Sequence, residues 1–253
     1  MTTFKVAIPA RFASSRLPGK PLIELAGKPM IQHVYERALK SGADEIVIAT
    51  DDRRIFETAE SFGAEVCMTS TEHHSGSDRL AELADLRNWP DDAIIVNLQG
   101  DEPLTPRAIL KQAARGLDEH PDAGIATLCT PITSASQLYD PHTVKVVRDQ
   151  AGYALYFSRA PIPWERDALD VEAHPEHNQA FRHIGLYAYR AGYLREYAKS
   201  DPCDLERIER LEQLRALWQG VKIFVDIAEQ LPGHGVDTPE DVAAVAALLN
   251  QQS

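Results

Sequence analysis

Arginine and lysine side chains gather in the first loop of the chain, where they could bind phosphate. The loop runs from Pro9 to Pro21 and carries Arg11, Arg16 and Lys20 among small and hydroxylated residues. A guanidinium binds phosphate oxygens through two parallel hydrogen bonds and an ammonium acts as a point charge, so the loop suits a polyphosphate. It matches neither a Walker A loop nor a G-x-G-x-x-G fingerprint. The alternative is a basic loop that is merely solvated.

Two separated carboxylates could bind a divalent cation. Asp101 follows the apolar segment 93–98 directly after Gly100, and Asp237 precedes the expected N-cap of the last helix at Thr238. Mg²⁺ is commonly held by one or two carboxylates together with substrate phosphates. Each aspartate also has a structural explanation, as a turn residue or as an acidic residue that a helix dipole favours. Combined with the basic loop, they supply the groups for metal-assisted chemistry on a nucleoside triphosphate.

The first half of the chain alternates between short apolar segments and stretches with an apolar residue every three or four positions. Such strand–helix–strand units predict a mostly parallel sheet with helices on both faces. Ligands bind at the carboxyl ends of the strands in these sheets, which is where the basic loop begins. Strands are expected at 4–8, 45–50, 64–68 and 93–98, and helices over 29–42, over 55–63, around 80–84 and after an N-cap at Thr105.

The pattern changes in the second half of the chain. Segments 143–148 and 153–158 flank a short turn and predict a hairpin, and a polar loop follows over 161–179. We expect one domain over 1–253, with a mixed-sheet insertion at roughly 131–200. The remaining elements are expected to be strands at 183–189 and 221–228, a helix at 204–218 with Ile208, Leu211 and Trp218 in the core, and a helix at 239–250.

Composition excludes several classes of protein. The chain has 26 basic and 38 acidic side chains, a net charge of −12, which argues against a nucleic-acid or anionic-membrane partner. Cys67, Cys129 and Cys203 are far apart and form no C-x-x-C pair, so a reducing compartment is expected. No apolar run approaches the roughly 20 residues of a membrane span, and the first residues show no signal peptide. We expect a cytoplasmic protein.

Several separated motifs are spread over nearly the whole chain. They are IPARFASSRLPGKPL (8–22), SGSDRLAE (75–82), VNLQGDEP (96–103), VKVVRD (144–149), GYALYFSRAPIPW (152–164), RHIGLYAYR (182–190), LEQLR (211–215) and GVDTPEDV (235–242). Together they resemble one known family, the 3-deoxy-manno-octulosonate (Kdo) cytidylyltransferases. CMP–sialic acid synthetases share only a looser version of the first loop.

The resemblance implies a Rossmann-like fold of the nucleotide-diphospho-sugar transferase type. It also implies a homodimer in which CTP and Kdo react, with Mg²⁺, to give CMP-Kdo and pyrophosphate for lipopolysaccharide biosynthesis. The insertion would carry the sugar site and dimer contacts. The implied catalytic residues are Arg11, Lys20, Asp101 and Asp237, with both aspartates binding the metal. The nucleotide would contact Ala10, Arg11, Ser14, Lys20, Ser75, Gly76 and Arg79, and the sugar Gln99, Arg159, His183, Glu212 and Gln213.

Other interpretations remain open at this level. His183, judged by its place on a strand alone, favours a structural histidine with its hydrogen bonds satisfied, and Glu212 could be a solvated charge. The substrate could be 8-amino-Kdo or another acidic sugar, and the chain could be a nucleotide-binding module without activity. A nicotinamide-dependent oxidoreductase would share the α/β alternation, but its glycine fingerprint is absent.

Overall fold

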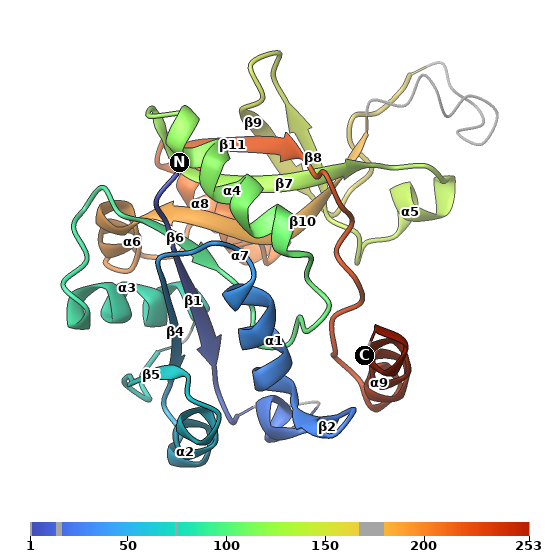
Figure 1. The fold of residues 1–253 in the computed structure, drawn as a ribbon. Coiled ribbons are helices and arrows are strands. Elements are labelled where there is room, and N and C mark those ends of the chain that lie inside the picture. Colours follow the sequence, from blue (N-terminus) through green and yellow to red (C-terminus); the bar gives the residue numbers. More distant parts are fainter. Residues whose placement is uncertain (1, 14–16, 74, 167–179, 253) are drawn as a thin grey trace.

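The computed structural model describes residues 2–13, 17–73, 75–166 and 180–252. A nine-stranded sheet runs through the molecule in the order β11-β7-β10-β6-β1-β4-β5, and β8 and β9 extend it beside β10 (Figure 1). Its strands are β1 Lys5–Ala10, β4 Glu45–Thr50, β5 Glu65–Met68, β6 Ile94–Asn97, β7 Ala123–Pro131, β8 Lys145–Arg148, β9 Ala154–Ser158, β10 Phe181–Arg190 and β11 Lys222–Ile227. A small separate sheet pairs β2 Glu24–Leu25 with β3 Lys28–Pro29.

Helices cover both faces of the sheet. They are α1 Met30–Leu39, α2 Arg53–Ser61, α3 Gly76–Leu86, α4 Arg107–Glu119, α5 Ala135–Tyr139, α6 Ala191–Tyr197, α7 Asp204–Glu209, α8 Gln213–Trp218 and α9 Pro239–Gln252, with a 3₁₀ turn, η1, at Lys20–Leu22. None of the described helices is long and apolar enough to cross a membrane.

The sheet has a parallel half and a mixed half. Strands β5, β4, β1 and β6 are parallel neighbours. Strand β10 then runs antiparallel to both β6 and β7, while β11 is parallel to β7. The predicted hairpin is confirmed as the antiparallel pair β8–β9. The predicted α/β fold with a mixed-sheet region is therefore confirmed.

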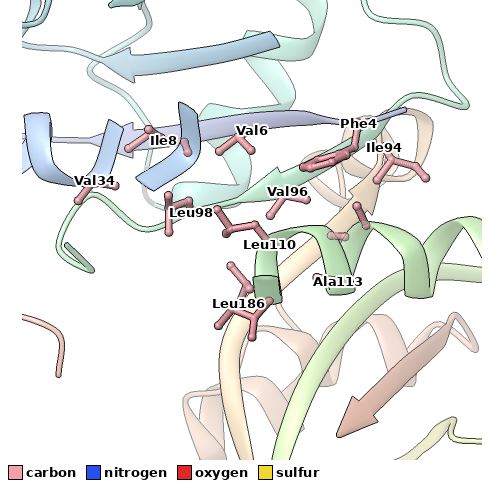
Figure 2. Close-up of a cluster of buried hydrophobic side chains, with 14 of the residues drawn as sticks. Phe4, Val6, Ile8, Val34, Ile94, Val96, Leu98, Leu110, Ala113 and Leu186 are labelled. Atoms are coloured by element: carbon pink, nitrogen blue, oxygen red, sulfur yellow. The ribbon is translucent and has the colours of Figure 1, made fainter. Parts of the chain in front are cut away.

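Alternation along β1 supplies both hydrophobic layers. Val6 and Ile8 point to the face covered by α1, α2 and α4, where Figure 2 shows them with Phe4 and Val34. Ala7 points to the opposite face, covered by α3, α6 and α8. A strand buried on both faces must be apolar at nearly every position, which is why this segment stands out in the sequence.

The predicted helix over 204–218 is wrong, because the chain breaks it into α7 and α8. Arg210 has a left-handed backbone conformation, with φ 53° and ψ 50°, and ends α7. Apolar spacing cannot detect such a break. Of the three residues expected in the core, Leu211 is buried, but Ile208 and Trp218 are 77% and 62% exposed.

A buried ion pair holds the two short helices together across this break. The guanidinium of Arg215 donates two hydrogen bonds, at 2.7 and 2.6 Å, to the carboxylate of Glu206.

The expected N-cap at Thr105 is also wrong. Helix α4 begins at Arg107 after Pro106, and the Thr105 hydroxyl instead donates to Glu102.

Candidate active site

A cleft of about 300 Å³, here called the first cleft, opens where β1 and β6 end at their carboxyl sides. The structure brings together there most of the residues that the resemblance assigned to the nucleotide and the metal. Ser14 lies outside the described residues. The predicted residues that line the first cleft are Ala10, Arg11, Lys20, Ser75, Gly76, Arg79, Gln99, Asp101 and Asp237.

A lysine and two aspartates meet at the floor of the first cleft. Lys20 Nζ lies 2.5 Å from Asp101 Oδ2 and 3.0 Å from Asp237 Oδ1, although the partners are 81 and 217 residues away in sequence. Lys20 itself is buried. The two carboxylates therefore converge on one cation, and their hard oxygen atoms suit a divalent metal ion of the magnesium type.

The described residues contain no cluster of three or more histidine, cysteine, aspartate or glutamate side chains arranged to hold a metal. Magnesium does not need such a cluster, because it is usually held by one or two carboxylates, water and substrate phosphates. Asp101 and Asp237 thus fit a metal that arrives with a nucleotide, and they do not fit an all-protein metal cage.

A close backbone approach positions Asp101. A Cβ atom added to Gly100 would lie 2.9 Å from the carbonyl oxygen of Pro9, so only glycine allows the turn after β6 to pack against the end of β1. The turn carries Asp101 directly to the start of the basic loop. Gly100 therefore helps to position Asp101.

A strap after β11 brings Asp237 to the same place, and Figure 1 shows the chain running from β11 to α9, beside β2. Val236 donates its N–H to the carbonyl of Asp101 at 2.9 Å. Gly233 packs so tightly on Leu104 that an added Cβ would lie 2.5 Å from the Leu104 Cβ. The predicted cap at Thr238 is confirmed by its hydroxyl, which accepts the N–H of Asp241 at 3.3 Å.

Helix α3 begins at the first cleft and its N-terminus faces it. Ser75 and Asp78 form a capping box, each side chain accepting the other's backbone N–H. Arg79, in the first turn, is buried, and its guanidinium bonds to Asp51 at 2.6 Å and to the Thr69 hydroxyl. Its charge is already neutralised, so Arg79 shapes the wall of the first cleft and adds little free positive charge.

A second pocket of about 350 Å³ adjoins the first cleft and shares Arg11, Ser75, Gly76 and Gln99 with it. The predicted sugar residues Glu212 and Gln213 line this second pocket. Desolvation by the surrounding protein, together with the carboxylate of Glu206, raises the pKa of Glu212. The pocket also contains residues that sequence reasoning missed: Ser77, Asn97, Ile125, Tyr187, Tyr189, Tyr197, Arg210 and Leu211.

Two polar groups of the second pocket have no partner among the described residues. Asn97 is 3% exposed and Gln213 is 6% exposed, and Asn97 Oδ1 and Gln213 Nε2 are buried without a hydrogen bond. Leaving such an atom unsatisfied is costly, so the pocket is suited to a polar ligand. Asn97 stands two residues before Gln99, and this strand-like spacing was a signal available in the sequence.

Two predicted sugar residues line neither the first cleft nor the second pocket. Arg159 donates hydrogen bonds to the main-chain carbonyls of Glu209 at 2.8 Å and Pro141 at 2.9 Å. His183 Nε2 lies 3.0 Å from the Thr127 hydroxyl, and burial lowers the pKa of His183 to about 3. This geometry favours the structural interpretation of His183, with a neutral ring at physiological pH.

The sheet and the first cleft define a nucleotide-transferring α/β enzyme, and a family model described as cytidylyltransferase matches residues 6–223. The chain belongs to the 3-deoxy-manno-octulosonate cytidylyltransferase family. A protein of this name from Thioalkalivibrio sulfidiphilus is 61% identical over 98% of this chain and 99% of its own. Another from Coxiella burnetii is 55% identical over 97% of this chain and 99% of its own.

A solved structure has the same fold over its whole length. The structure of CMP:2-keto-3-deoxy-manno-octonic acid synthetase complexed with CTP superposes with a TM-score of 0.90 at 42% identity, covering 99% of this chain and all of that one. The predicted Rossmann-like fold of the nucleotide-diphospho-sugar transferase type is thus confirmed.

Proposed function

We propose that this protein transfers the cytidylyl group of CTP to Kdo, giving CMP-Kdo and pyrophosphate for lipopolysaccharide synthesis. The observation that carries the proposal is the convergence of Lys20 with Asp101 and Asp237 in a cleft that continues into a polar pocket. A nucleotide and a sugar bound in two adjoining sites would meet at their boundary. Relatives that are 53–61% identical carry the corresponding name.

The triphosphate is proposed to occupy the first cleft. Ala10, Arg11, Ser14 and Lys20 would contact its phosphates, and Ser75, Gly76 and Arg79 would form the nucleotide wall at the start of α3. Arg11 and Lys20 can neutralise the charge that grows on the departing pyrophosphate, which is the main task of a protein in phosphoryl-type transfer. The N-terminus of α3 adds a favourable potential for an anion.

Mg²⁺ is the proposed cofactor, with Asp101 and Asp237 as its protein ligands. When bound, the ion would supply positive charge at the phosphates. Once a nucleotide arrives with this ion, Lys20 can exchange its carboxylate partners for phosphate oxygens. The ion triad thus keeps both carboxylates in position before the substrate binds, which lowers the reorganisation needed in the reaction.

The sugar is proposed to occupy the second pocket, where Gln99, Glu212 and Gln213 can bond to its hydroxyl groups. Its anomeric hydroxyl would attack the α-phosphorus in line with the departing pyrophosphate, and Gln99, which lines both sites, stands at that boundary. Arg159 and His183 stay proposed sugar-site residues on the resemblance alone. Arg159 bonds to the main-chain carbonyl of Glu209 in α7, and the ring of His183 contacts that of Tyr187, so both would act on the sugar only through these neighbours.

We propose that residues 1–253 form one nucleotidyltransferase domain, which forms a homodimer through its insertion at roughly 131–200. Exposed apolar side chains within the insertion support this: Tyr139 at the end of α5, Leu155 on β9 and Trp164 after β9. Light scattering of the wild type and of Leu155→Ser tests the proposed dimer, since the variant should shift toward the monomer.

A cytoplasmic location is also proposed. The three cysteines are free thiols, and together with the use of CTP, a cytosolic nucleotide, they support it.

The deciding experiment measures pyrophosphate release with each of CTP, UTP, ATP and GTP, paired with Kdo, 8-amino-Kdo and sialic acid, with and without Mg²⁺. We expect turnover with CTP and Kdo that depends on the metal. Turnover with sialic acid but not Kdo would overturn the sugar assignment. Binding of CTP without turnover of any pair would instead identify a nucleotide-binding module.

A further inference from the structure

The second pocket contains an arginine that the reaction proposed above does not use. Arg210 lines the pocket beside Leu211, Glu212 and Gln213. Its backbone N–H bonds to the carbonyl of Glu206 where α7 ends. Its guanidinium makes no hydrogen bond or ion pair with any part of the chain that the structure describes. The five donors of this side chain are therefore available to a ligand.

The backbone at this arginine is unfavourable for the residue type. Arg210 has φ 53°, in the left-handed region, where a Cβ atom crowds the following carbonyl and glycine is preferred. The only other non-glycine residues with positive φ in the described chain are Ala26 and Asn88, and neither lines the second pocket. A strained residue at the edge of a pocket points to a function of its side chain.

The negative charge of the proposed sugar substrate requires a cationic partner, which the Arg210 side chain can provide. Glu212 lines the same pocket and would repel an acidic sugar when ionised. Arg159, the arginine that the resemblance assigns to the sugar, is bound to the main-chain carbonyls of Glu209 and Pro141. Among described residues, only Arg11 and Arg210 bring guanidinium groups to the second pocket, and Arg11 also lines the first cleft.

The surroundings of Arg210 are suited to a polyhydroxylated acid. The unpartnered atoms Asn97 Oδ1 and Gln213 Nε2 offer one acceptor and one donor, which hydroxyl groups can satisfy together. A guanidinium fork matches a carboxylate in two parallel hydrogen bonds. The pocket thus combines hydroxyl-binding groups with one group of the right shape for an acid.

We propose that Arg210 binds the carboxylate of the sugar substrate and makes the second pocket selective for acidic sugars. This inference rests on the proposed function, since it assumes that an acidic sugar enters this pocket. Arg210 acts here as a substrate-binding residue, and it takes no part in the bonds that form and break.

The test varies Kdo at saturating CTP and Mg²⁺ and measures pyrophosphate release. For Arg210→Gln we expect the KM for Kdo to rise about tenfold, as for one lost charge-assisted hydrogen bond pair, with the KM for CTP unchanged within about twofold. Arg210→Lys keeps the charge but loses the fork, so its KM for Kdo should lie between those of the wild type and Arg210→Gln.

Glycine at the same position separates function from folding. Arg210→Gly removes the backbone strain, so its Tm should rise by about 2 to 4 °C while its KM for Kdo rises as in Arg210→Gln. A merely structural arginine would not give a gain in thermal stability together with a loss of affinity for the sugar. Arg207→Gln is the matched control, because Arg207 stands on α7, pairs with Asp204 and lines neither site.

Two results would overturn the inference. One is a KM for Kdo that stays within about twofold of the wild type in both Arg210→Gln and Arg210→Gly. The other is an equal rise in the KM values for CTP and Kdo, which would indicate a general disturbance of the site. A wild type that turns over no acidic sugar would instead remove the proposed function, and this inference with it.

Discussion

The first cleft and the second pocket adjoin, yet their polar groups are satisfied in different ways. In the first cleft the buried cations are paired within the protein: Lys20 with Asp101 and Asp237, and Arg79 with Asp51. In the second pocket, polar atoms such as Asn97 Oδ1 have no partner in the described chain. The first cleft is therefore preorganised by its own ion pairs, whereas the second pocket depends on a ligand to satisfy its polar groups.

This difference predicts different responses to mutation. A mutation that removes one member of an ion pair in the first cleft leaves the other charge without its partner and disturbs the geometry of the reacting groups. A mutation of an unpartnered polar group in the second pocket affects mainly the affinity for the ligand that binds there. Three predictions concern the first cleft, and the effects expected at Arg210 concern the second pocket. A fourth prediction, at His183, adds a residue that lines neither site.

The largest effect is expected at the two carboxylates of the first cleft. Asp101→Asn or Asp237→Asn should lower turnover at least about a hundredfold, a loss of roughly 2.7 kcal/mol of barrier stabilisation, because the proposed metal loses a charged ligand. Steady-state pyrophosphate release measures this, with circular dichroism to confirm folding. Asp122→Asn is the control, since Asp122 pairs with Lys222 far from the first cleft. Wild-type rates in both variants would remove the metal role.

Lys20→Met should change two quantities in opposite directions. Turnover should fall by about a hundredfold because the pyrophosphate loses a cationic partner. Binding of Mn²⁺ to the nucleotide-free protein should become about fivefold tighter, because the lysine no longer competes for the two carboxylates. Electron paramagnetic resonance of a Mn²⁺ titration measures the second effect. Weaker Mn²⁺ binding in the variant would show that the lysine does not compete with a metal.

A smaller effect is expected where the strap packs on Leu104. Gly233→Ala would bring its Cβ within 2.5 Å of the Leu104 Cβ and so displace Asp237. We expect the Mg²⁺ concentration for half-maximal rate to rise about tenfold, with the KM for Kdo unchanged. The double variant Gly233→Ala, Leu104→Gly should recover part of this loss because the clash is removed. A change in the KM for Kdo alone would contradict the separation of the two sites.

The smallest effect on catalysis is expected at His183, whose role is measured by stability. Burial lowers the pKa of His183 to about 3 in the folded protein, below its usual value near 6.5. The unfolded chain therefore binds more protons between these values, and stability falls as pH drops through that window. From pH 6.5 to 5 the loss is at most about 2 kcal/mol.

Urea denaturation of the wild type and His183→Gln across this window measures the histidine's share of the pH dependence. The variant should lose less stability on acidification than the wild type. His142→Gln, at an exposed histidine, is the control and should behave as the wild type does. Equal pH dependence in the wild type and His183→Gln would show that His183 is not held neutral by the fold.

The sequence allowed most of the first cleft to be predicted, since its residues stand in short motifs beside strong secondary-structure signals. Gly100 and Asp101 follow a strand that is buried throughout, and Thr238 caps a clear helix. Much of the second pocket was missed. The missed residues come from α3, β6, β7, β10, α6 and the break between α7 and α8, and no local pattern joins them.

The break at Arg210 shows why the prediction failed there. Residues 204–218 have the apolar spacing of one helix, and arginine is a good helix former. The chain nevertheless takes a left-handed turn at this residue, stabilised by the ion pair between Glu206 and Arg215 across the break. The burial that makes this pair strong depends on elements distant in sequence.

The sequence by itself determined the α/β fold, the basic loop, the two carboxylates and the family to which they belong. These follow from local spacing and from motifs, which are properties of neighbouring residues. Only the tertiary structure decided that Lys20 joins Asp101 and Asp237, that Arg159 and His183 bond to other partners, and that Arg210 lines the second pocket. Those contacts depend on close packing between distant segments, and local patterns carry no information about which distant groups will meet.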